Sequence, residues 1–161
     1  MKFVDTKVVF REIPDEISLA INISGCPVKC PGCHSKYLQD EIGEELTYES
    51  LGDIIEKNSG ISCVSFMGGD ANPDKVKEFS IWIHNKYPGL KTAWYSGRTL
   101  ELGKDNLCTL DFIKVGPYDD KFGPLDSETT NQRFYQIEHT PDGPVLNDWT
   151  SRFTKKNPIN L

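Results

Sequence analysis

Hydrophobic and polar positions along the chain predict strands near its start. Apolar residues recur through Lys2–Arg11, and they occupy every second position of Ile17–Ile23, as in a strand with one buried face. Pro14–Glu16, between these segments, has the composition of a turn. Residues 1–23 are therefore predicted to form a hairpin whose second strand leads into a loop at residues 24–36.

The hydrophobic pattern of residues 47–138 predicts helices that alternate with strands. Helices are expected from Thr47 to about Asn58, from Pro73 to about Lys86, and for a short stretch around Leu100–Leu102. Strands are expected at residues 61–66, 90–95, 112–115 and 133–138. Residues 139–161 are predicted to form a loosely structured tail.

This alternation predicts an α/β domain in which a parallel sheet is built through right-handed crossovers. At 161 residues the chain is the size of one domain, 1–161. About five strand–helix units are too few for a closed eight-stranded barrel, so we expect a partial (βα) barrel that is open on one side. Ligands of such sheets bind at the carboxyl ends of the strands.

Three cysteines stand close together directly after the second predicted strand. Cys26, Cys30 and Cys33 have the spacing Cys-x3-Cys-x2-Cys. Three thiolates on one short loop can bind three irons of a [4Fe-4S] cubane, which leaves the fourth iron free for a substrate or cofactor. We therefore predict that the loop at residues 24–36 holds an iron–sulfur cluster.

Zinc and disulfides are the alternatives for these cysteines. A zinc ion held by Cys26, Cys30, Cys33 and His34 would be unusual, because structural zinc sites typically join two close pairs of ligands that are well separated in sequence. A disulfide framework fits poorly because the five cysteines are an odd number and the chain starts without a secretory hydrophobic segment. We therefore expect a cytoplasmic protein whose thiols stay reduced.

Composition and charge exclude two classes of partner. The net charge of -6 argues against a nucleic-acid partner, since phosphate binding needs a concentrated basic surface. The apolar runs are much shorter than a membrane span, so no membrane role is expected. The candidate chemistry therefore rests on the cysteine loop and on the other loops that follow strands.

The cysteine loop resembles that of the radical S-adenosylmethionine (SAM) superfamily, in which a Cys-x3-Cys-x2-Cys loop holds a [4Fe-4S] cluster at the top of a partial barrel. Within this superfamily, Gly25–His34, Thr130–Arg133 and the short length make the chain most similar to the activating proteins of anaerobic (class III) ribonucleotide reductases. The resemblance covers most of the chain. It implies a partial barrel of the radical SAM type.

The resemblance also implies a reaction. The reduced cluster would cleave SAM, and the resulting 5′-deoxyadenosyl radical would take a hydrogen atom from a glycine on the large subunit of the anaerobic ribonucleotide reductase. An external one-electron donor such as flavodoxin would supply the electron, and the sequence allows a homodimer. Two alternatives stay open: an activase of another glycyl radical enzyme, and a non-catalytic iron–sulfur or zinc module for electron transfer or binding.

Residues of the strand-end loops match the superfamily pattern in part. The three cysteines match the cluster ligands. Gly68, Gly69 and Asp70 align with a Gly-Gly-Glu-type loop whose backbone meets the amino group of the cofactor, and glycines let the backbone approach closely. Asp70 is a departure, since the broader pattern often has glutamate there.

Further cofactor contacts are implied with less support from the pattern. Gly32 occupies a position where many superfamily members have an aromatic residue near the adenine, so His34 or Tyr37 would cover the adenine instead. Ser96 and Arg98 follow the strand at 90–95 and are candidates on the same rim, with Arg98 suited to the cofactor carboxylate. Capping a helix or pairing with a surface acid is the alternative role of Arg98.

Other chemistry-bearing residues are assigned to structure. Cys63 and Cys108 lie in or beside apolar segments and are predicted to be small core residues. His84 and His139 are assigned to the surface or to structural contacts. Residues 118–131 form a long polar loop, which is either a contact site for the reductase or a solvated loop.

Overall fold

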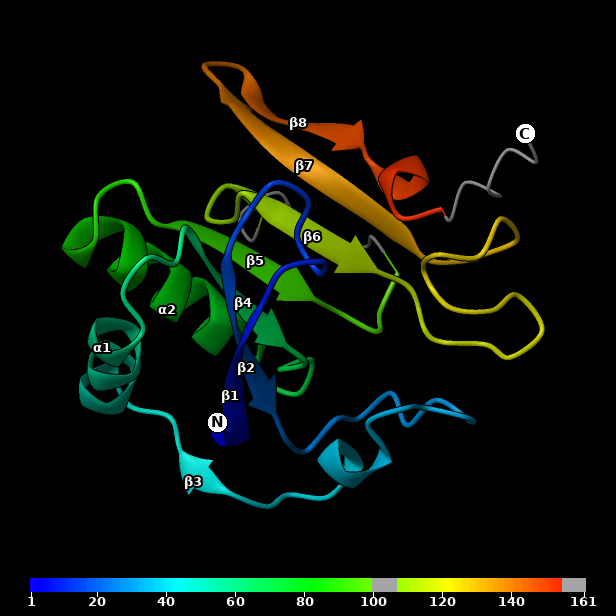
Figure 1. Ribbon diagram of the computed structural model, residues 1–161, viewed down its shortest axis with the longest axis horizontal. Coiled ribbons are helices and arrows are strands. Elements are labelled where there is room, and N and C mark those ends of the chain that lie inside the picture. The colour runs from blue at the N-terminus through cyan, green and yellow to red at the C-terminus, as the bar shows by residue number, and fades with distance from the viewer. Residues whose placement is uncertain (100–106, 155–161) are drawn as a thin grey trace, which may run out of the picture.

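The computed structural model describes residues 1–99 and 107–154, and it has one mixed sheet of eight strands (Figure 1). The strand order is β3-β1-β2-β4-β5-β6-β7-β8, so the sheet ends at β3 and β8 and does not close on itself. The strands are β1 (Lys2–Val9), β2 (Ser18–Ile23), β3 (Glu44–Glu45), β4 (Cys63–Met67), β5 (Lys91–Tyr95), β6 (Phe112–Val115), β7 (Arg133–Thr140) and β8 (Gly143–Asp148). The helices of the described residues are α1 (Tyr48–Lys57) and α2 (Pro73–Lys86), with short 3-10 turns η1 (Lys36–Gln39) and η2 (Thr150–Arg152).

The predicted hairpin and the two longer predicted helices are confirmed. Strands β1 and β2 pair antiparallel, as expected for residues 1–23. Helix α1 begins after Thr47, whose hydroxyl accepts from Ser50 N–H while Ser50 Oγ accepts from Thr47 N–H, and this capping box satisfies two backbone donors. The short helix expected around Leu100–Leu102 lies outside the described residues. No helix in the described ranges has the length and apolar character needed to span a bilayer.

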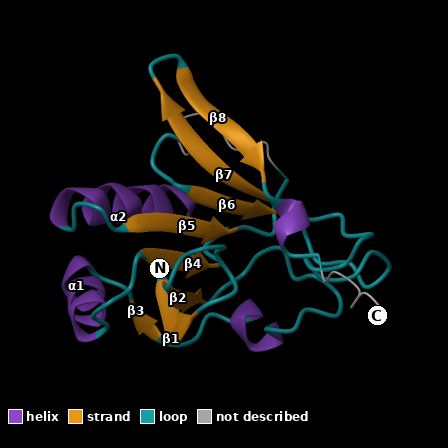
Figure 2. Cartoon of the chain, turned by 45° about the horizontal axis from the view of Figure 1, so that its top comes forward, coloured by secondary structure: helices purple, strands orange, loops and turns teal. Residues whose placement is uncertain are grey.

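Four strands at the centre of the sheet, β2, β4, β5 and β6, run parallel. Their carboxyl ends therefore lie at the same edge of the sheet, and Figure 2 shows long loops beyond the arrowheads of β5 and β6. Helix α2 joins β4 to β5 as a crossover connection, which parallel strands require. This edge is where a ligand of a parallel sheet is expected.

The two faces of the sheet are covered by different parts of the chain. On one face, Phe66 and Trp94 pack in a cluster with Phe79 of α2. On the other face, Ala93 belongs to a second cluster that includes the fully buried Ile13, from the connection between β1 and β2. Ile13 thereby occupies part of the face without α-helices.

Strand β7 runs antiparallel to β6, which differs from the parallel units expected up to residue 138. Residues 116–132, which connect the two strands, contain no helix in the structure. A parallel strand needs a crossover that carries the chain back to the other end of the sheet, and that crossover is usually a helix. Without one, the chain turns and β7 pairs alongside β6 in the opposite direction.

The predicted loose tail is wrong for its first part, because Gly143–Asp148 forms strand β8 and pairs antiparallel with β7. The turn between these strands has the sequence Thr140-Pro141-Asp142-Gly143, and Thr140 Oγ1 donates to Gly143 O at 2.8 Å. Pro-Asp-Gly is a turn signal with a known mechanism, since proline and glycine supply the required φ angles. Pairing with β8 satisfies backbone groups that β7 would otherwise present at an open edge.

Candidate metal centre

The cysteine loop follows β2 and is held by hydrogen bonds within itself and to η1. Cys26 N–H donates to Leu38 O at 3.0 Å, and Cys33 N–H donates to Cys30 O at 3.3 Å. Gly32 has a φ of 75°, a conformation that glycine adopts without steric cost. The three cysteines are free and partly exposed, so their sulfurs are available as ligands.

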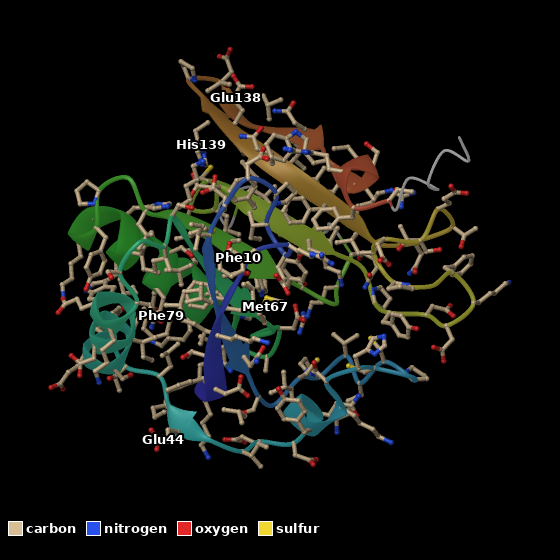
Figure 3. The ribbon with its side chains drawn as sticks, viewed as in Figure 1. Phe10, Glu44, Met67, Phe79, Glu138 and His139 are labelled. Atoms are coloured by element: carbon tan, nitrogen blue, oxygen red, sulfur yellow. The ribbon has the colours of Figure 1, made fainter. Side chains whose placement is uncertain are left out.

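All three cysteines line a cavity of about 370 Å³, which also receives side chains from the carboxyl ends of the parallel strands. Asn22, Met67, Tyr95 and Lys114 pair successively across β2, β4, β5 and β6, and all four line this cavity. Met67, which is labelled in Figure 3, is the last residue of β4. Paired residues of neighbouring strands point to the same face, so these four side chains form one row beside the cysteine loop.

The fold brings most of the predicted site residues to this cavity. The predicted site residues that line it are Cys26, Cys30, Cys33, His34, Gly68, Asp70 and Ser96. Three others, which the structure also describes, lie outside its lining: Tyr37, Gly69 and Arg98. Loops that follow β2, β4 and β5 therefore meet at one rim, and the three residues outside the lining need separate description.

Gly68 and Gly69 make a tight turn after β4, with φ angles of 103° and 97°. A Cβ atom on Gly68 would lie 3.0 Å from Ile23 O, and one on Gly69 would lie 2.9 Å from Val76 Cγ2. Trp94 Nε1–H donates to Gly68 O at 2.7 Å. Both positions thus require glycine for packing within the protein itself, whatever ligand the turn contacts.

Asp70 connects the loops that follow β4 and β5. Its side chain is only 1% exposed, and it accepts hydrogen bonds from Ser96 Oγ at 2.5 Å and from Gly97 N–H at 2.9 Å. The Arg98 guanidinium donates to Asp70 O at 2.7 Å. Protein donors therefore occupy both carboxylate oxygens of Asp70, and Arg98 braces the same junction.

Of the two residues predicted to cover an adenine, His34 lies in the cavity lining and Tyr37 does not. The ring of His34 packs 5.4 Å from that of Tyr118, measured between centroids. The Tyr37 hydroxyl lies 3.4 Å from Asp5 Oδ2, and burial together with the negative charge of Asp5 raises the pKa of Tyr37. The adenine contact of either residue stays a prediction, with His34 the better placed.

Lys114, near the end of β6, was not predicted as a site residue and is only 9% exposed. Lys114 Nζ donates to Gly116 O at 2.8 Å and lies 3.5 Å from Ser96 O. Burial lowers the pKa of Lys114 to about 8, opposed by negative charge at Cys30, Asp70 and the other two cysteines of the loop. The sequence did contain a signal for this residue. Lys114 stands inside the short apolar strand predicted at residues 112–115, and a buried lysine usually has a partner.

Gln132 is a second cavity residue that sequence analysis did not single out. It is 5% exposed, and its Nε2 group donates to Gly116 O at 3.3 Å. It belongs to the Thr130–Arg133 segment that carries the family resemblance, whereas Asn131 is exposed and donates to Pro117 O. The pairing of Val115 in β6 with Arg133 in β7 sets Gln132 across from Gly116, so the strand register decides which residue of this segment enters the cavity.

The loop between β6 and β7 packs against the cysteine loop. A Cβ atom on Gly32 would lie 2.5 Å from Asp120 Oδ2, so the two loops are in close contact. Tyr118 and Leu125 of the same loop line the cavity. This loop is therefore part of the site, and its contact with a reductase stays a prediction.

The two remaining cysteines have different environments. Cys63 is fully buried in β4, as predicted, and burial raises the pKa of its thiol. Cys108 is exposed, so the prediction of a core position is wrong for this residue. Its neighbours Leu107 and Leu110 take the buried positions of that turn, which leaves Cys108 on the outer side.

His84 has a structural role, as predicted, in a polar contact far from the cysteine loop in sequence. Its Nε2 lies 3.0 Å from Asp111 Oδ2, and Thr92 N–H donates to the same oxygen at 2.8 Å. Although burial acts in the opposite direction, these two hydrogen bonds lower the pKa of Asp111. The contact joins α2 to β5 and to the start of β6.

A family model described as a 4Fe-4S single cluster domain matches residues 17–134. The chain belongs to this family. The matched range begins just before β2 and ends in β7, so it contains the cysteine loop and every segment that lines the cavity. No curated protein and no solved structure matches the chain.

The site suits the [4Fe-4S] cluster of this family. Three free thiols on one loop are suited to bind three irons, and the buried ammonium group of Lys114 borders the same cavity. Within the described ranges, no three His, Cys, Asp or Glu side chains converge on the position of a single metal ion. A cubane does not require such convergence, because each thiolate binds a different iron.

Proposed function

We propose that this 4Fe-4S single cluster domain is a radical SAM oxidoreductase that activates a glycyl radical enzyme, the large subunit of an anaerobic ribonucleotide reductase. The observation that carries the proposal is the number of cysteines at the cavity. All five cysteines are described, and three of them line the cavity while Cys63 and Cys108 do not. Three thiolates leave one iron of a cubane without a protein ligand, which an electron carrier does not need.

The chain's own residues would bind and orient two cofactors. Cys26, Cys30 and Cys33 would hold the cluster, and SAM would bind where Gly68 and the row of strand-end residues line the cavity. When bound, this pair supplies one-electron reductive cleavage of SAM and abstraction of a hydrogen atom from a protein glycine. The protein contributes binding, orientation and exclusion of water.

Architecture supports the same proposal. The parallel strands β2, β4, β5 and β6, with α1 and α2 packed on one face, are consistent with a partial barrel of the radical SAM type. The cysteine loop follows the first strand of this parallel set, and the glycine turn follows the second. We expect the protein to act in the cytoplasm, with an external one-electron donor such as flavodoxin.

The first experiment tests SAM chemistry. Protein purified and reconstituted without oxygen is expected to hold about four irons per chain. Reduction with dithionite in the presence of SAM should then yield 5′-deoxyadenosine and methionine in equal amounts. Cys30→Ala should abolish this cleavage, whereas the matched control Cys108→Ala should retain it. A four-iron protein that leaves SAM intact would refute the radical SAM proposal and favour an electron-transfer module.

The second experiment tests the partner. The reduced protein and SAM are mixed with the large subunit of an anaerobic ribonucleotide reductase, and the mixture is examined by electron paramagnetic resonance. A glycyl radical signal on that subunit is expected, and it should be missing when Cys30→Ala replaces the wild type. SAM cleavage without this signal, combined with a signal on another glycyl radical enzyme, would reassign the partner but not the chemistry.

A further inference from the structure

Lys114 stands out among the residues of the cavity. In the described part of the chain, the cavity lining contains one lysine and no arginine. Strand pairing places Lys114 beside Tyr95 in the row of strand-end residues, and Lys114 is only 9% exposed. A buried cation therefore lies on the face of the sheet that borders the cysteine loop.

The protein provides no carboxylate partner for this cation among the described residues. Within residues 1–99 and 107–154, ion pairs within 4.0 Å do not include Lys114, and its Nζ lies within hydrogen-bond distance of the carbonyl oxygens of Gly116 and Ser96. The nearby Asp70 carboxylate accepts from Ser96 and Gly97 instead. Burying an ammonium group with neutral partners alone is costly, so a negative group in the cavity would stabilise it.

The cysteine loop supplies that negative group when it holds the cluster. The cysteines line the same cavity as Lys114, and negative charge on each of them acts to raise the pKa of Lys114. A cubane with thiolate ligands is an anion, and each reduction adds one negative charge. A fixed cation in a low-dielectric site therefore stabilises the reduced form more than the oxidised form.

We propose that Lys114 supplies the counter-charge that makes the cluster easier to reduce. The inference rests on the cluster of the proposed function and does not depend on SAM or on the reductase. The electron comes from an external low-potential reductant, and Lys114 neither gains nor loses a bond. Charge and burial near an iron–sulfur cluster are among the factors that set its reduction potential.

The test compares Lys114→Gln with Lys57→Gln, which removes the same unit of charge from the exposed last residue of α1, outside the cavity lining. Anaerobic proteins with equal iron and sulfide content are poised with dithionite and redox mediators, without SAM, and the reduced cluster is quantified by electron paramagnetic resonance. At a fixed ambient potential, K114Q should lower the ratio of reduced to oxidised cluster at least tenfold, which is about 59 mV for a one-electron couple. K57Q should change the ratio less than twofold.

If K114Q fails to hold a cluster, a second variant, Gln132→Glu, tests the same proposal. Gln132 Nε2 and Lys114 Nζ donate to the same carbonyl, Gly116 O, so Gln132→Glu places a carboxylate beside the ammonium group and offsets its charge. Q132E should also lower the reduced fraction, and Lys114→Arg should stay within threefold of wild type. The measurement counts for K114Q, or for Q132E if K114Q holds no cluster, provided that the variant binds four irons. A change of twofold or less in its ratio of reduced to oxidised cluster overturns the proposal. Wild-type protein without a four-iron cluster would instead refute the proposed function, which separates the two failures.

Discussion

Replacing Asp70 with asparagine tests whether this side chain joins two loops of the cavity rim. The Asp70 carboxylate accepts from Ser96 Oγ and Gly97 N–H while almost fully buried. Asparagine keeps one acceptor oxygen, and it turns an N–H₂ group toward the other donor. One charge-assisted hydrogen bond is therefore lost, and one buried donor is left without an acceptor.

The expected cost follows from these two losses. A hydrogen bond to a charged group contributes about 1.5–3 kcal/mol, and a buried unsatisfied donor costs about 1–3 kcal/mol. The neutral side chain has a smaller desolvation penalty, which offsets part of this sum. We expect Asp70→Asn to lower the free energy of unfolding by about 3 kcal/mol, or the melting temperature by roughly 6–12 °C for a chain of this length.

Urea unfolding of the reduced, cluster-free protein, followed by far-UV circular dichroism, measures this cost. Ser96→Ala should lower the free energy of unfolding as well, and the double variant should show coupling because the two side chains form one hydrogen bond. Asp53→Asn, at an exposed position of α1, is the matched control and should stay within about 0.5 kcal/mol of wild type. A D70N protein as stable as wild type that binds SAM poorly would refute this reasoning and return Asp70 to a cofactor-binding role.

Three further variants test the core, the cluster ligands and a polar contact. Ile13→Ala should lower the free energy of unfolding in urea by about 2–4 kcal/mol, because Ile13 is fully buried against the sheet. Cys30→Ala should reduce the iron content of reconstituted protein to below about half of the wild-type value, since two thiolates on the loop hold a cubane poorly. Asp111 has a lowered pKa in the folded state, so its carboxylate stabilises the fold above its unfolded pKa of about 3.9, and this contribution is lost as the pH falls through the folded pKa. The difference in unfolding free energy between wild type and Asp111→Asn should therefore be present at pH 7 and shrink below about pH 4.

Two of these variants have a control on the same chain, and the third is checked by the direction of its pH dependence. Val145→Ala removes a half-exposed side chain from β8 and should cost less than about 0.5 kcal/mol, in contrast to Ile13→Ala. Cys108→Ala should leave the iron content unchanged, because Cys108 is exposed outside the cavity lining. A difference between wild type and Asp111→Asn that grows as the pH falls from 5 to 3 would contradict the role given to the contact with His84.

The local elements of this fold could be predicted from sequence because local residues determine them. The Thr47 cap, the proline that begins α2 and the alternation of β2 all act over a few residues, and all three elements form where expected. Strand β8 was missed although its Pro-Asp-Gly turn is a local signal. The direction of β7 was also missed, although the long polar loop predicted at residues 118–131 contains no crossover helix and is therefore consistent with an antiparallel return.

The site divides in the same way. Cys26, Cys30 and Cys33 could be predicted as ligands from their spacing alone, since candidate ligands on one loop need no information from the rest of the chain. Tyr37 and Arg98 were placed by proximity in sequence to the loops of the rim, and neither lines the cavity. Asp70 lies in the cavity lining, as predicted, but its carboxylate accepts a hydrogen bond from the Ser96 hydroxyl in the loop after β5.

The sequence by itself was enough to predict an iron–sulfur cluster on a loop after a strand, because the spacing of three cysteines within eight residues needs no long-range contact to be recognised. Only the tertiary structure decided what faces that loop. Lys114 enters the cavity because the pairing of β5 with β6 aligns it with Tyr95, and Gln132 reaches Gly116 across from β7. Such register is a property of hydrogen bonds between strands that are distant in sequence, so no spacing along the chain could show it.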